Sequence, residues 1–455
     1  MARQPMQQKP IIFLPIESTP REIDYKLNIA RLMCHQGFDA IIGNPPFIRD
    51  ELKYKNYQGV FLEKGMNPDP AYYKKIIDKG ILVYCLSDEG AAEPAFSVTY
   101  QPAVDTLKQA EKIFLWGVHQ KQDLVRRNSD PCLLDKYYVS GYPSFEFSLP
   151  KYKKYHAYFR DQDLGNNYIL VNTNFSSVNG YSLEEVLKAC NAMSPETKAS
   201  ITISYQHEEA VLKSFLHWLE EIFLAFPGEN FLIRPHPAER QNAYDRLSQK
   251  YKNVRVSGKG NANQAISGAK LVLHNDCTTA LQSYLACVPV ISLSTQNEHL
   301  LSSPWSIQFG AKPTELCEAI ALVENVLKNG HFDESLRKHI DENAQVVLSQ
   351  RFCHIETSTK DIVDHIVKGK NEKLVGIFPY KIKDTRTLLQ KVKLMIRKRL
   401  PLHYKVPVAS RHMLAKFTKK DVLDRLNLMN DLDHVSRNYI IKEVFPNTFY
   451  IARGF

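Results

Sequence analysis

Residues 231–237 read Phe-Leu-Ile-Arg-Pro-His-Pro, a short apolar run that ends in a cation, a histidine and two prolines. Residues 271–279 follow the same plan, because Leu-Val-Leu is followed by His-Asn-Asp-Cys-Thr-Thr and then by a helix-like segment. Each stretch reads as a buried strand with polar residues at its carboxyl end. In open α/β sheets these ends converge on one crevice where ligands bind. The two stretches therefore predict an anion site, best suited to a nucleotide phosphate.

The two stretches supply cationic and hydroxyl ligands. Arg234 and His236 can donate charge-assisted hydrogen bonds to a phosphate. Thr278 and Thr279 offer hydroxyls and the free N–H groups of the helix that they begin. His236 lies between two prolines, which favour extended, exposed backbone, so its sequence context favours a functional role over a core position.

Three of these assignments have structural alternatives. His274 follows an apolar run, so it is either a second phosphate ligand or a satisfied buried histidine. Thr278 could serve only as a helix cap. Arg234 could pair with Glu239 and not with a ligand.

The chain on either side of these stretches alternates strands and helices, which predicts parallel sheets. The first part has expected strands at residues 11–16, 38–42, 60–62, 81–86, 113–115 and 137–139, separated by helices at 21–36, 72–79, 104–111 and 117–127. The second part has expected strands at 168–172, 231–233, 254–256, 271–274 and 290–292, with helices at 182–193, 210–226, 242–251, 262–267, 279–286, 314–328, 334–350 and 357–367.

This alternation predicts an α/β protein with two doubly wound, Rossmann-like domains that face a cleft, the architecture called GT-B. The expected domains are 1–160 and 161–370. Residues 371–455 form the third part, a basic helical extension. The polar, tyrosine-rich stretch 150–167 is the expected linker. Composition also permits other two-domain α/β enzymes.

Composition indicates a globular protein of the cytoplasm. The 455 residues are 44% hydrophobic and 24% charged, and no apolar run approaches the ~18 residues that span a bilayer. The expected first strand begins too early to leave room for a signal-peptide core. Eight scattered cysteines without a CxxC pair predict reduced thiols and no zinc site.

The positive charge is concentrated in the C-terminal extension. Residues 371–455 hold 18 Lys/Arg and 7 Asp/Glu, a net charge of +11, whereas the whole chain has +10. This distribution argues against a nucleic-acid function for the main body. Residues 381–400 alternate basic and apolar side chains in a pattern typical of helices on anionic membranes, and a solvated helix packed on the body is the alternative.

A pair of carboxylates follows the expected strand 81–86. Asp88 and Glu89 precede Gly90, which allows a sharp turn at the carboxyl end of that strand. A carboxylate beside another and among apolar neighbours has a raised pKa and suits general-base work. The alternative is that one of the two caps the next turn. A second acidic pair, Asp161 and Asp163, forms the DxD pattern of metal-dependent transferases, but a solvated turn is the favoured reading and no metal is expected.

The set Asp88-Glu89-Gly90, His236-Pro237 and Thr278-Thr279 resembles the three motifs of bacterial GT-B sialyltransferases that use CMP-sugars. Residues 11 to about 300 also resemble the bacterial surface carbohydrate biosynthesis proteins, which are similar to Kdo transferases of capsule and lipopolysaccharide. The resemblance implies that Glu89 is the catalytic base, that His236 contacts the leaving phosphate, and that Thr278 and Thr279 bind the CMP phosphate.

Two positions depart from this pattern. Gln282 stands where many GT-B transferases place a glutamate that holds the ribose hydroxyls, and we retain it as a candidate nucleotide ligand. His274 is absent from the sialyltransferase pattern, but paired histidines resemble teichoic-acid glycerophosphate transferases, which use CDP-glycerol.

The leading hypothesis is a metal-independent glycosyltransferase without a cofactor. It moves a CMP-activated ulosonic acid, Kdo or a sialic-type nonulosonic acid, onto a surface polysaccharide or lipopolysaccharide. The acceptor is a glycan or lipid-linked glycan, and residues 371–455 are expected to reach the inner membrane from the cytoplasm. The rivals are a CDP-glycerol-type phosphotransferase, a nucleotide-sugar epimerase and an inactive scaffold, and both inverting and retaining transfer stay open.

Overall fold

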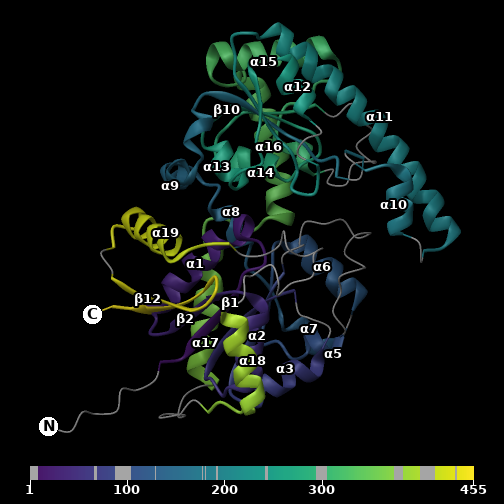
Figure 1. Cartoon of the computed structure of the whole chain (residues 1–455). Helices are drawn as coiled ribbons and strands as arrows, with labels where there is room; N and C mark the ends of the chain where they lie inside the picture. Colours follow the sequence, from purple (N-terminus) through teal and green to yellow (C-terminus); the bar gives the residue numbers. More distant parts are fainter. Residues whose placement is uncertain are drawn as a thin grey trace. The chain divides into compact units, whose positions relative to one another are not determined.

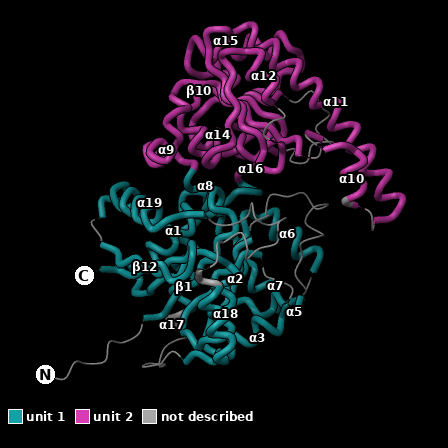
Figure 2. Tube along the Cα trace, viewed as in Figure 1, with its two compact units in different colours: residues 1–147, 349–455 teal, residues 148–348 magenta. Residues whose placement is uncertain are grey.

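The computed structural model describes residues 9–65, 69–87, 104–128, 130–176, 178–179, 181–190, 193–240, 244–293, 305–373, 383–399, 416–435 and 438–454. The chain forms two compact units, unit 1 with residues 1–147 and 349–455, and unit 2 with residues 148–348 (Figures 1 and 2). Each unit contains a sheet built mainly from parallel strands. The predicted α/β fold with parallel strands is therefore confirmed.

Unit 1 is built on an eight-stranded sheet in the order β12-β13-β2-β1-β3-β4-β5-β6. Six strands are parallel, and most of their side chains are buried because helices cover both faces. They are β1 (Ile11–Pro15), β2 (Asp39–Gly43), β3 (Gly59–Lys64), β4 (Ile81–Leu86), β5 (Ile113–Leu115) and β6 (Tyr137–Val139). The chain diverges from β1 in both directions, so the topological switch point lies between β1 and β3.

The C-terminal hairpin extends this sheet. Strands β12 (Tyr439–Phe445) and β13 (Thr448–Arg453) are antiparallel, and β13 pairs with β2. Gly43 makes the approach feasible, because a Cβ at that position would lie 2.2 Å from the carbonyl oxygen of Asn447. The segment predicted as a separate helical extension, 371–455, thus ends as a sheet edge of unit 1, and the predicted boundaries at 160 and 370 differ from those of the two units.

Helices cover both faces of the unit 1 sheet. Helices α2 (Pro45–Tyr54) and α3 (Pro70–Ile77) pack on a core that includes Phe13 and Phe61. Helices α1 (Thr19–His35) and α17 (Ser358–Lys373) contact each other on the opposite face, where His365 packs against Phe114. The other α-helices in the described part of this unit are α5 (Val104–Leu107), α6 (Val118–Arg127), α7 (Pro131–Leu134), α8 (Pro143–Glu146), α18 (Leu388–Arg399) and α19 (Lys419–Leu432).

Unit 2 is built on a five-stranded parallel sheet in the order β11-β10-β7-β8-β9. The strands are β7 (Tyr168–Asn172), β8 (Phe231–Arg234), β9 (Val254–Val256), β10 (Ala269–His274) and β11 (Val290–Ser292). The chain runs from β7 through β8 to β9 on one side and returns to β10 and β11 on the other. The switch point of this sheet therefore lies between β7 and β10.

Each face of the unit 2 sheet has its own cover. One face packs on α11 (Pro195–Ala225) and α15 (Leu316–Asn329) in an apolar core that includes Val171, Phe223 and Leu273. The other face contacts α13 (Ala262–Ile266) and α14 (Thr279–Leu285), and the hydroxyl of Tyr168 donates to the carbonyl of Ala265. The other α-helices described around this sheet are the short helices α10 (Leu183–Ala189) and α12 (Asp245–Lys250) and the longer helix α16 (Glu334–Arg351).

The predicted linker 150–167 is largely structured. It contains the short helices η2 (Pro150–Tyr152), α9 (Lys153–Phe159) and η3 (Gln162–Leu164). Tyr152 and Tyr155 are buried, because a tyrosine ring adds apolar contact area although its hydroxyl makes the sequence look polar. No helix in the described part of the chain is both long enough and apolar enough to cross a bilayer.

Candidate functional site in unit 2

The switch point of unit 2 is lined by a row of polar side chains. Arg234, Asn172, His274 and Ser292 are paired in register at the carboxyl ends of β8, β7, β10 and β11. In-register residues of parallel strands point to the same face of the sheet, with neighbouring strands about 4.8 Å apart. Tyr168 and Asn172 are four positions apart on β7, so their side chains point to the same face. The hydroxyl of Tyr168 bonds to Ala265 of α13, so this is the face that α13 and α14 cover. We call these four residues the polar row.

Several polar atoms of this region are buried without a partner. Both amide atoms of Asn172, Nε2 of His274, Oγ of Ser292 and Oδ1 of the adjacent Asn275 have no hydrogen-bond partner within the part of the chain that the structure describes. Each of these side chains is at most 3% exposed. An unsatisfied buried polar group costs about 1–3 kcal/mol, so a cluster of them indicates a place where a ligand or water completes the bonding.

His274 is neutral in this environment. Its Nδ1 accepts a hydrogen bond from the backbone N–H of Cys277 at 3.3 Å, so the ring proton resides on Nε2. Complete burial lowers the pKa of His274 to about 3. Of the two sequence alternatives, a fully satisfied core histidine does not fit, because the Nε2–H donor has no partner among the described residues. His274 can offer a neutral donor to a ligand.

Arg234 is a cation without a carboxylate partner among the described residues. Its guanidinium donates to the carbonyl oxygens of Lys259 and Gly260, both at 2.8 Å. These two bonds fix the head group at the end of the sheet but leave its charge uncompensated. Gly260 has a φ of +70°, and a Cβ there would collide with Gln264 at 2.2 Å, so the turn that presents these carbonyls favours glycine.

Glu239 holds the loops that follow β7 and β8. Its buried carboxylate accepts hydrogen bonds from the side chains of Thr173 (2.8 Å), Asn179 (2.7 Å) and Tyr244 (2.7 Å) and from the backbone N–H groups of Phe175 and His236 (both 3.1 Å). The predicted alternative in which Glu239 pairs with Arg234 is wrong, because the bonds of Arg234 go to the two carbonyls. Glu239 instead orders the backbone that carries His236.

The remaining predicted ligands lie around the same strand ends. His236 is half-buried two residues after Arg234, and its Nδ1 accepts from the N–H of Ala238 at 3.2 Å. Thr278 is exposed and its side chain forms no cap bond, which removes the alternative of a simple side-chain cap. The hydroxyl of Thr279 donates to the thiol of Cys277 at 3.2 Å.

Gln282 and the DxD pattern have structural partners. The amide of Gln282 donates to Asn263 of α13 at 3.1 Å, which ties α14 to α13. Asp161 caps the short helix η3 by accepting from the N–H of Asp163, and it pairs with Lys259 at 2.9 Å. The DxD pattern therefore forms the turn that the sequence favoured.

In unit 1, the two carboxylates predicted to supply the catalytic base, Asp88 and Glu89, lie outside the described residues, as does Gly90. The last described residue before it is Ser87, at the carboxyl end of β4. Ser87 accepts hydrogen bonds from the indole of Trp116 on its carbonyl and from the amide of Gln120 on its hydroxyl, the latter at 2.8 Å. The position from which the acidic pair follows is therefore fixed to β5 and α6.

A buried charge cluster occupies the switch point of unit 1. Glu22 accepts from Lys26 at 2.7 Å and from Lys64 at 3.2 Å, and Lys64 also pairs with Glu17 at 3.1 Å. Burial alone would raise the pKa of Glu22, but the two lysines outweigh burial and lower it to about 2. Glu22 is therefore a permanent anion at neutral pH and is unsuited to general-base work.

A surface hollow of about 200 Å³ lies beside α2 and α3 of unit 1. Its lining is formed by Pro46, Arg49, Asp50, Lys53, Asp69 and Tyr72. None of the predicted site residues lines it, so the hollow is distinct from the polar row.

Sequence reasoning did not single out Asn172, Ser292 and Glu239 as site residues. A signal for the first two exists, because each is a polar residue that closes a buried apolar strand, as Arg234 and His274 do. Glu239 carries no such signal, since its role depends on five donors from the two segments that follow β7 and β8.

No protein-family model and no curated protein matches the chain. Among solved structures, it is similar to a putative UDP-N-acetylglucosamine 2-epimerase from Listeria monocytogenes, with 13% identity, a TM-score of 0.49, and coverage of 80% of this chain and 97% of that one. It is similar to the UDP-GlcNAc 2-epimerase from Neisseria meningitidis bound to UDP-GlcNAc, with 14% identity, a TM-score of 0.46, and coverage of 79% and 100%. It is also similar to the wall teichoic acid polymerase TagF, with 10% identity, a TM-score of 0.46, and coverage of 80% and 90%. At these TM-scores and identities, the similarity alone establishes neither a shared fold nor a shared activity.

Proposed function

We propose that this chain is a glycosyltransferase of GT-B architecture in which the polar row of unit 2 binds the phosphate of a nucleotide-sugar donor. The observation that carries the proposal is Arg234, a cation held by two carbonyls without a described carboxylate partner. Beside it, Asn172 and His274 present buried polar atoms that lack partners among the described residues. A fixed cation next to a neutral N–H donor is suited to a phosphate, since both groups stabilise negative charge without rearrangement.

The proposed donor is a CMP-activated ulosonic acid, either Kdo or a sialic-type nonulosonic acid. Support comes from the resemblance of Asp88-Glu89-Gly90, His236-Pro237 and Thr278-Thr279 to the motifs of CMP-sugar transferases. A CMP-sugar carries one phosphate, whose charge Arg234 and the hydroxyls of Thr278 and Thr279 could stabilise without a metal ion. The proposed acceptor is a glycan of the cell surface or a lipid-linked precursor of it.

The proposed reaction is a direct displacement. Glu89 takes the proton of the acceptor hydroxyl, the acceptor oxygen bonds to the anomeric carbon, and the bond from that carbon to the phosphate oxygen breaks, which releases CMP. Inversion of the anomeric centre follows from this single step. A retaining reaction would instead use a carboxylate as nucleophile.

Replacement of Arg234 tests the binding site. We expect Arg234→Gln to weaken CMP binding about 10- to 100-fold, because hydrogen bonds to a charged group contribute about 1.5–3 kcal/mol and each 1.4 kcal/mol is tenfold in Kd. The measurement is titration calorimetry of CMP, CDP and UDP without added metal. Arg255→Gln is the matched control, because Arg255 is an exposed arginine on the neighbouring strand β9 that also bonds a carbonyl. Equal CMP affinity of wild type and Arg234→Gln would contradict the proposed site.

Replacement of Glu89 tests the catalytic step. We expect Glu89→Gln to lower turnover on the order of a hundredfold or more while CMP affinity is retained, because a general base acts in the transition state and not on the nucleotide. The measurement is CMP release from CMP-sugars in the presence of acceptor glycans, with Asp88→Asn as the comparison. Unchanged turnover in Glu89→Gln would remove Glu89 as the base and favour the inactive-scaffold alternative.

A CDP-glycerol-type phosphotransferase is the second candidate. Two histidines favour it. His236 lies two residues after the end of β8, His274 is the last residue of β10, and these two strands flank β7. The same calorimetric series separates the candidates, since this enzyme would bind CDP better than CMP and would release CMP from CDP-glycerol. An epimerase, the third alternative, would convert a nucleotide-sugar without any acceptor.

A further inference from the structure

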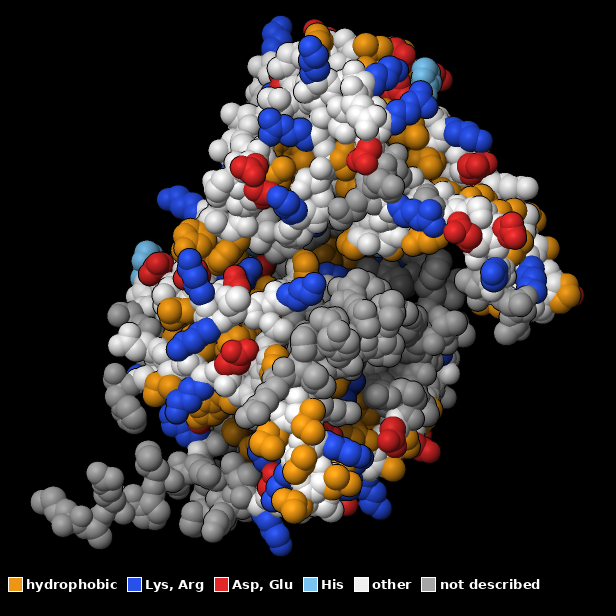
Figure 3. All heavy atoms as spheres, in the orientation of Figure 1, with side chains coloured by type: hydrophobic (Ala, Val, Ile, Leu, Met, Phe, Trp, Pro, Cys, Tyr) orange, Lys and Arg blue, Asp and Glu red, His pale blue; other side chains and the backbone are white. Residues whose placement is uncertain are grey.

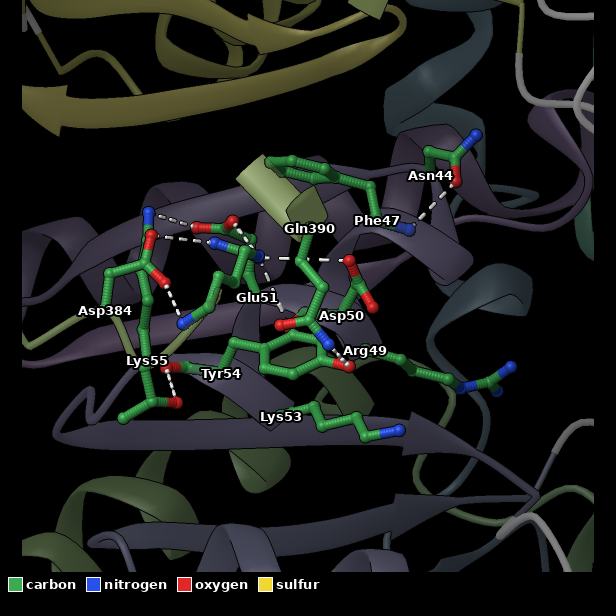
Figure 4. A network of polar contacts seen from close by, with 12 residues as sticks. Asn44, Phe47, Arg49, Asp50, Glu51, Lys53, Tyr54, Lys55, Asp384 and Gln390 are labelled. Atoms are coloured by element: carbon green, nitrogen blue, oxygen red, sulfur yellow. Dashed lines mark hydrogen bonds and ion pairs between the residues drawn. The ribbon is translucent and has the colours of Figure 1, made fainter. Parts of the chain in front are cut away.

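Helix α18 is fixed to unit 1 by a network around its first turn (Figure 4). The buried guanidinium of Arg386, just before the helix, pairs with Glu51 of α2 at 2.6 Å and with Asp384 at 3.2 Å. Its plane lies over the ring of Tyr54, 5.3 Å from the centroid, and Gln390 donates to the hydroxyl of that tyrosine at 3.2 Å. Helix α18 is thus held against α2, and Leu394 packs on the unit 1 core.

The opposite side of α18 exposes large apolar side chains. Five of them are 37–79% exposed, namely Leu388, Leu389, Val392, Met395 and Ile396. At 100° per residue these five fall on one face of the helix, roughly opposite Leu394. Figure 3 shows hydrophobic side chains gathered over α18 with Lys and Arg beside them. A surface helix normally turns its apolar face to the core, so this outward face needs another partner.

The charge of α18 selects that partner. Lys391 and Lys393 are exposed and lie on opposite flanks of the apolar face. The helix sequence also contains Arg397, Lys398 and Arg399, so it has five basic residues and no acidic residue. An apolar face with basic flanks matches the interface of an anionic membrane, where acyl chains lie beneath anionic head groups. A second copy of this helix would instead bring ten positive charges together.

We propose that α18 is a membrane-docking helix that inserts its exposed apolar face between the head groups of anionic lipids. Helix α18 and the Arg386 network that holds it against α2 are already formed, so docking requires no folding step at the membrane. The proposal narrows the predicted membrane contact from residues 371–455 to one helix face. It is independent of the proposed function, because vesicle binding is measured without nucleotide or acceptor.

Vesicle flotation of the full chain tests this proposal. We expect wild-type protein to float with phosphatidylcholine–phosphatidylglycerol vesicles and much less with phosphatidylcholine alone. The triple variant Leu388→Gln, Leu389→Gln, Met395→Gln is expected to lose about tenfold or more in vesicle affinity, since it removes most of the inserted apolar area. Lys391→Gln with Lys393→Gln is expected to lose about fivefold per lysine and to reduce the salt dependence.

The double variant Leu423→Gln, Ile440→Gln is the matched control. Both residues are exposed apolar residues of the same unit, 37% and 42% exposed, and lie outside α18. Thermal melts followed by circular dichroism verify that each variant folds. The proposal is overturned if the triple variant floats as wild type does, or if wild-type protein binds neither vesicle. It is also overturned if light scattering shows a dimer that only the triple variant dissociates, because the face would then bind a second copy.

Discussion

Glu239→Ala is expected to lower the free energy of unfolding of unit 2 on the order of 4 kcal/mol. The substitution leaves five donors without their acceptor, among them the hydroxyl of Tyr244 and the backbone N–H of Phe175, both in buried residues. Each unsatisfied buried donor costs about 1–3 kcal/mol, and entry of water into the vacated space offsets part of that sum. The predicted loss is therefore smaller than the sum of five separate penalties but larger than that of an average substitution.

Urea denaturation of the full chain measures this effect, with the fluorescence of Trp218 as the signal. Trp218 is buried in the core of unit 2, so phenylalanine at the other two tryptophans, Trp116 and Trp305, leaves a reporter for this unit alone. Glu229→Ala is the matched control, because Glu229 is a partly exposed carboxylate paired with Lys270 in the same unit. Such pairs contribute about 0–1 kcal/mol. A loss in Glu239→Ala no greater than that of the control would show that the five bonds do not act together.

The same substitution links the fold to the proposed site. Glu239 accepts from the backbone N–H of His236, and through Thr173 and Asn179 it also fixes the loop after β7. Glu239→Gln retains one acceptor oxygen but places an NH₂ group toward donors, so it is expected to weaken the loops less than alanine does. We expect CMP affinity to fall in the same order, from wild type to glutamine to alanine.

The parallel strands of both units were predictable because most of their side chains are buried on both faces. Residues 81–86 and 168–172 read as uninterrupted apolar runs closed by polar residues, and they coincide with β4 and β7. A strand buried between two helical layers is apolar on both faces, so it reads as a continuous apolar run that differs from the periodic pattern of a helix. The same reasoning located Arg234 and His274, since each ends such a run.

Helix α2 and the C-terminal hairpin were missed for different reasons. No helix was predicted between the strands 38–42 and 60–62, but Pro45 and Pro46 are favourable in the first turn of α2, and Asn44 caps that helix by accepting a hydrogen bond from the N–H of Phe47 at 3.1 Å. The hairpin joins β2 through contacts such as Asn44 with Thr448, 404 residues apart in sequence. No local pattern specifies a pairing over that separation.

The composition of the polar row depended on register, which the sequence does not contain. Asn172 becomes a neighbour of both Arg234 and His274 only because β7 lies between β8 and β10 at one particular alignment. Ser292 joins for the same reason on β11. Strand order and alignment are properties of the folded sheet, so the row could be completed only from the structure.

Glu22→Gln is expected to lower the free energy of unfolding of unit 1 by about 3–5 kcal/mol at neutral pH, because Lys26 would remain charged and buried without its carboxylate. The pKa of Glu22 is lowered from 4.5 to about 2, so its contribution is fully present above about pH 4.5 and is lost as pH falls toward 2. That shift corresponds to about 3 kcal/mol. Urea denaturation between pH 7 and pH 3 should show a steeper acid loss in wild type than in Glu22→Gln.

Two further variants show whether the loss of stability in Glu22→Gln comes from the broken ion pair with Lys26. Glu17→Gln is the matched control, since Glu17 contacts the same Lys64 from a more exposed position and should change stability by about 0–1 kcal/mol. The double variant Glu22→Gln, Lys26→Met removes both buried charges, so it should regain much of the stability that the single variant loses. If the double variant is instead as unstable as Glu22→Gln, the loss arises from packing and from the bonds that Glu22 accepts from the N–H groups of Glu17 and Ser18. Glu22 would then stabilise unit 1 by holding the backbone of residues 17 and 18, and not through its ion pair with Lys26.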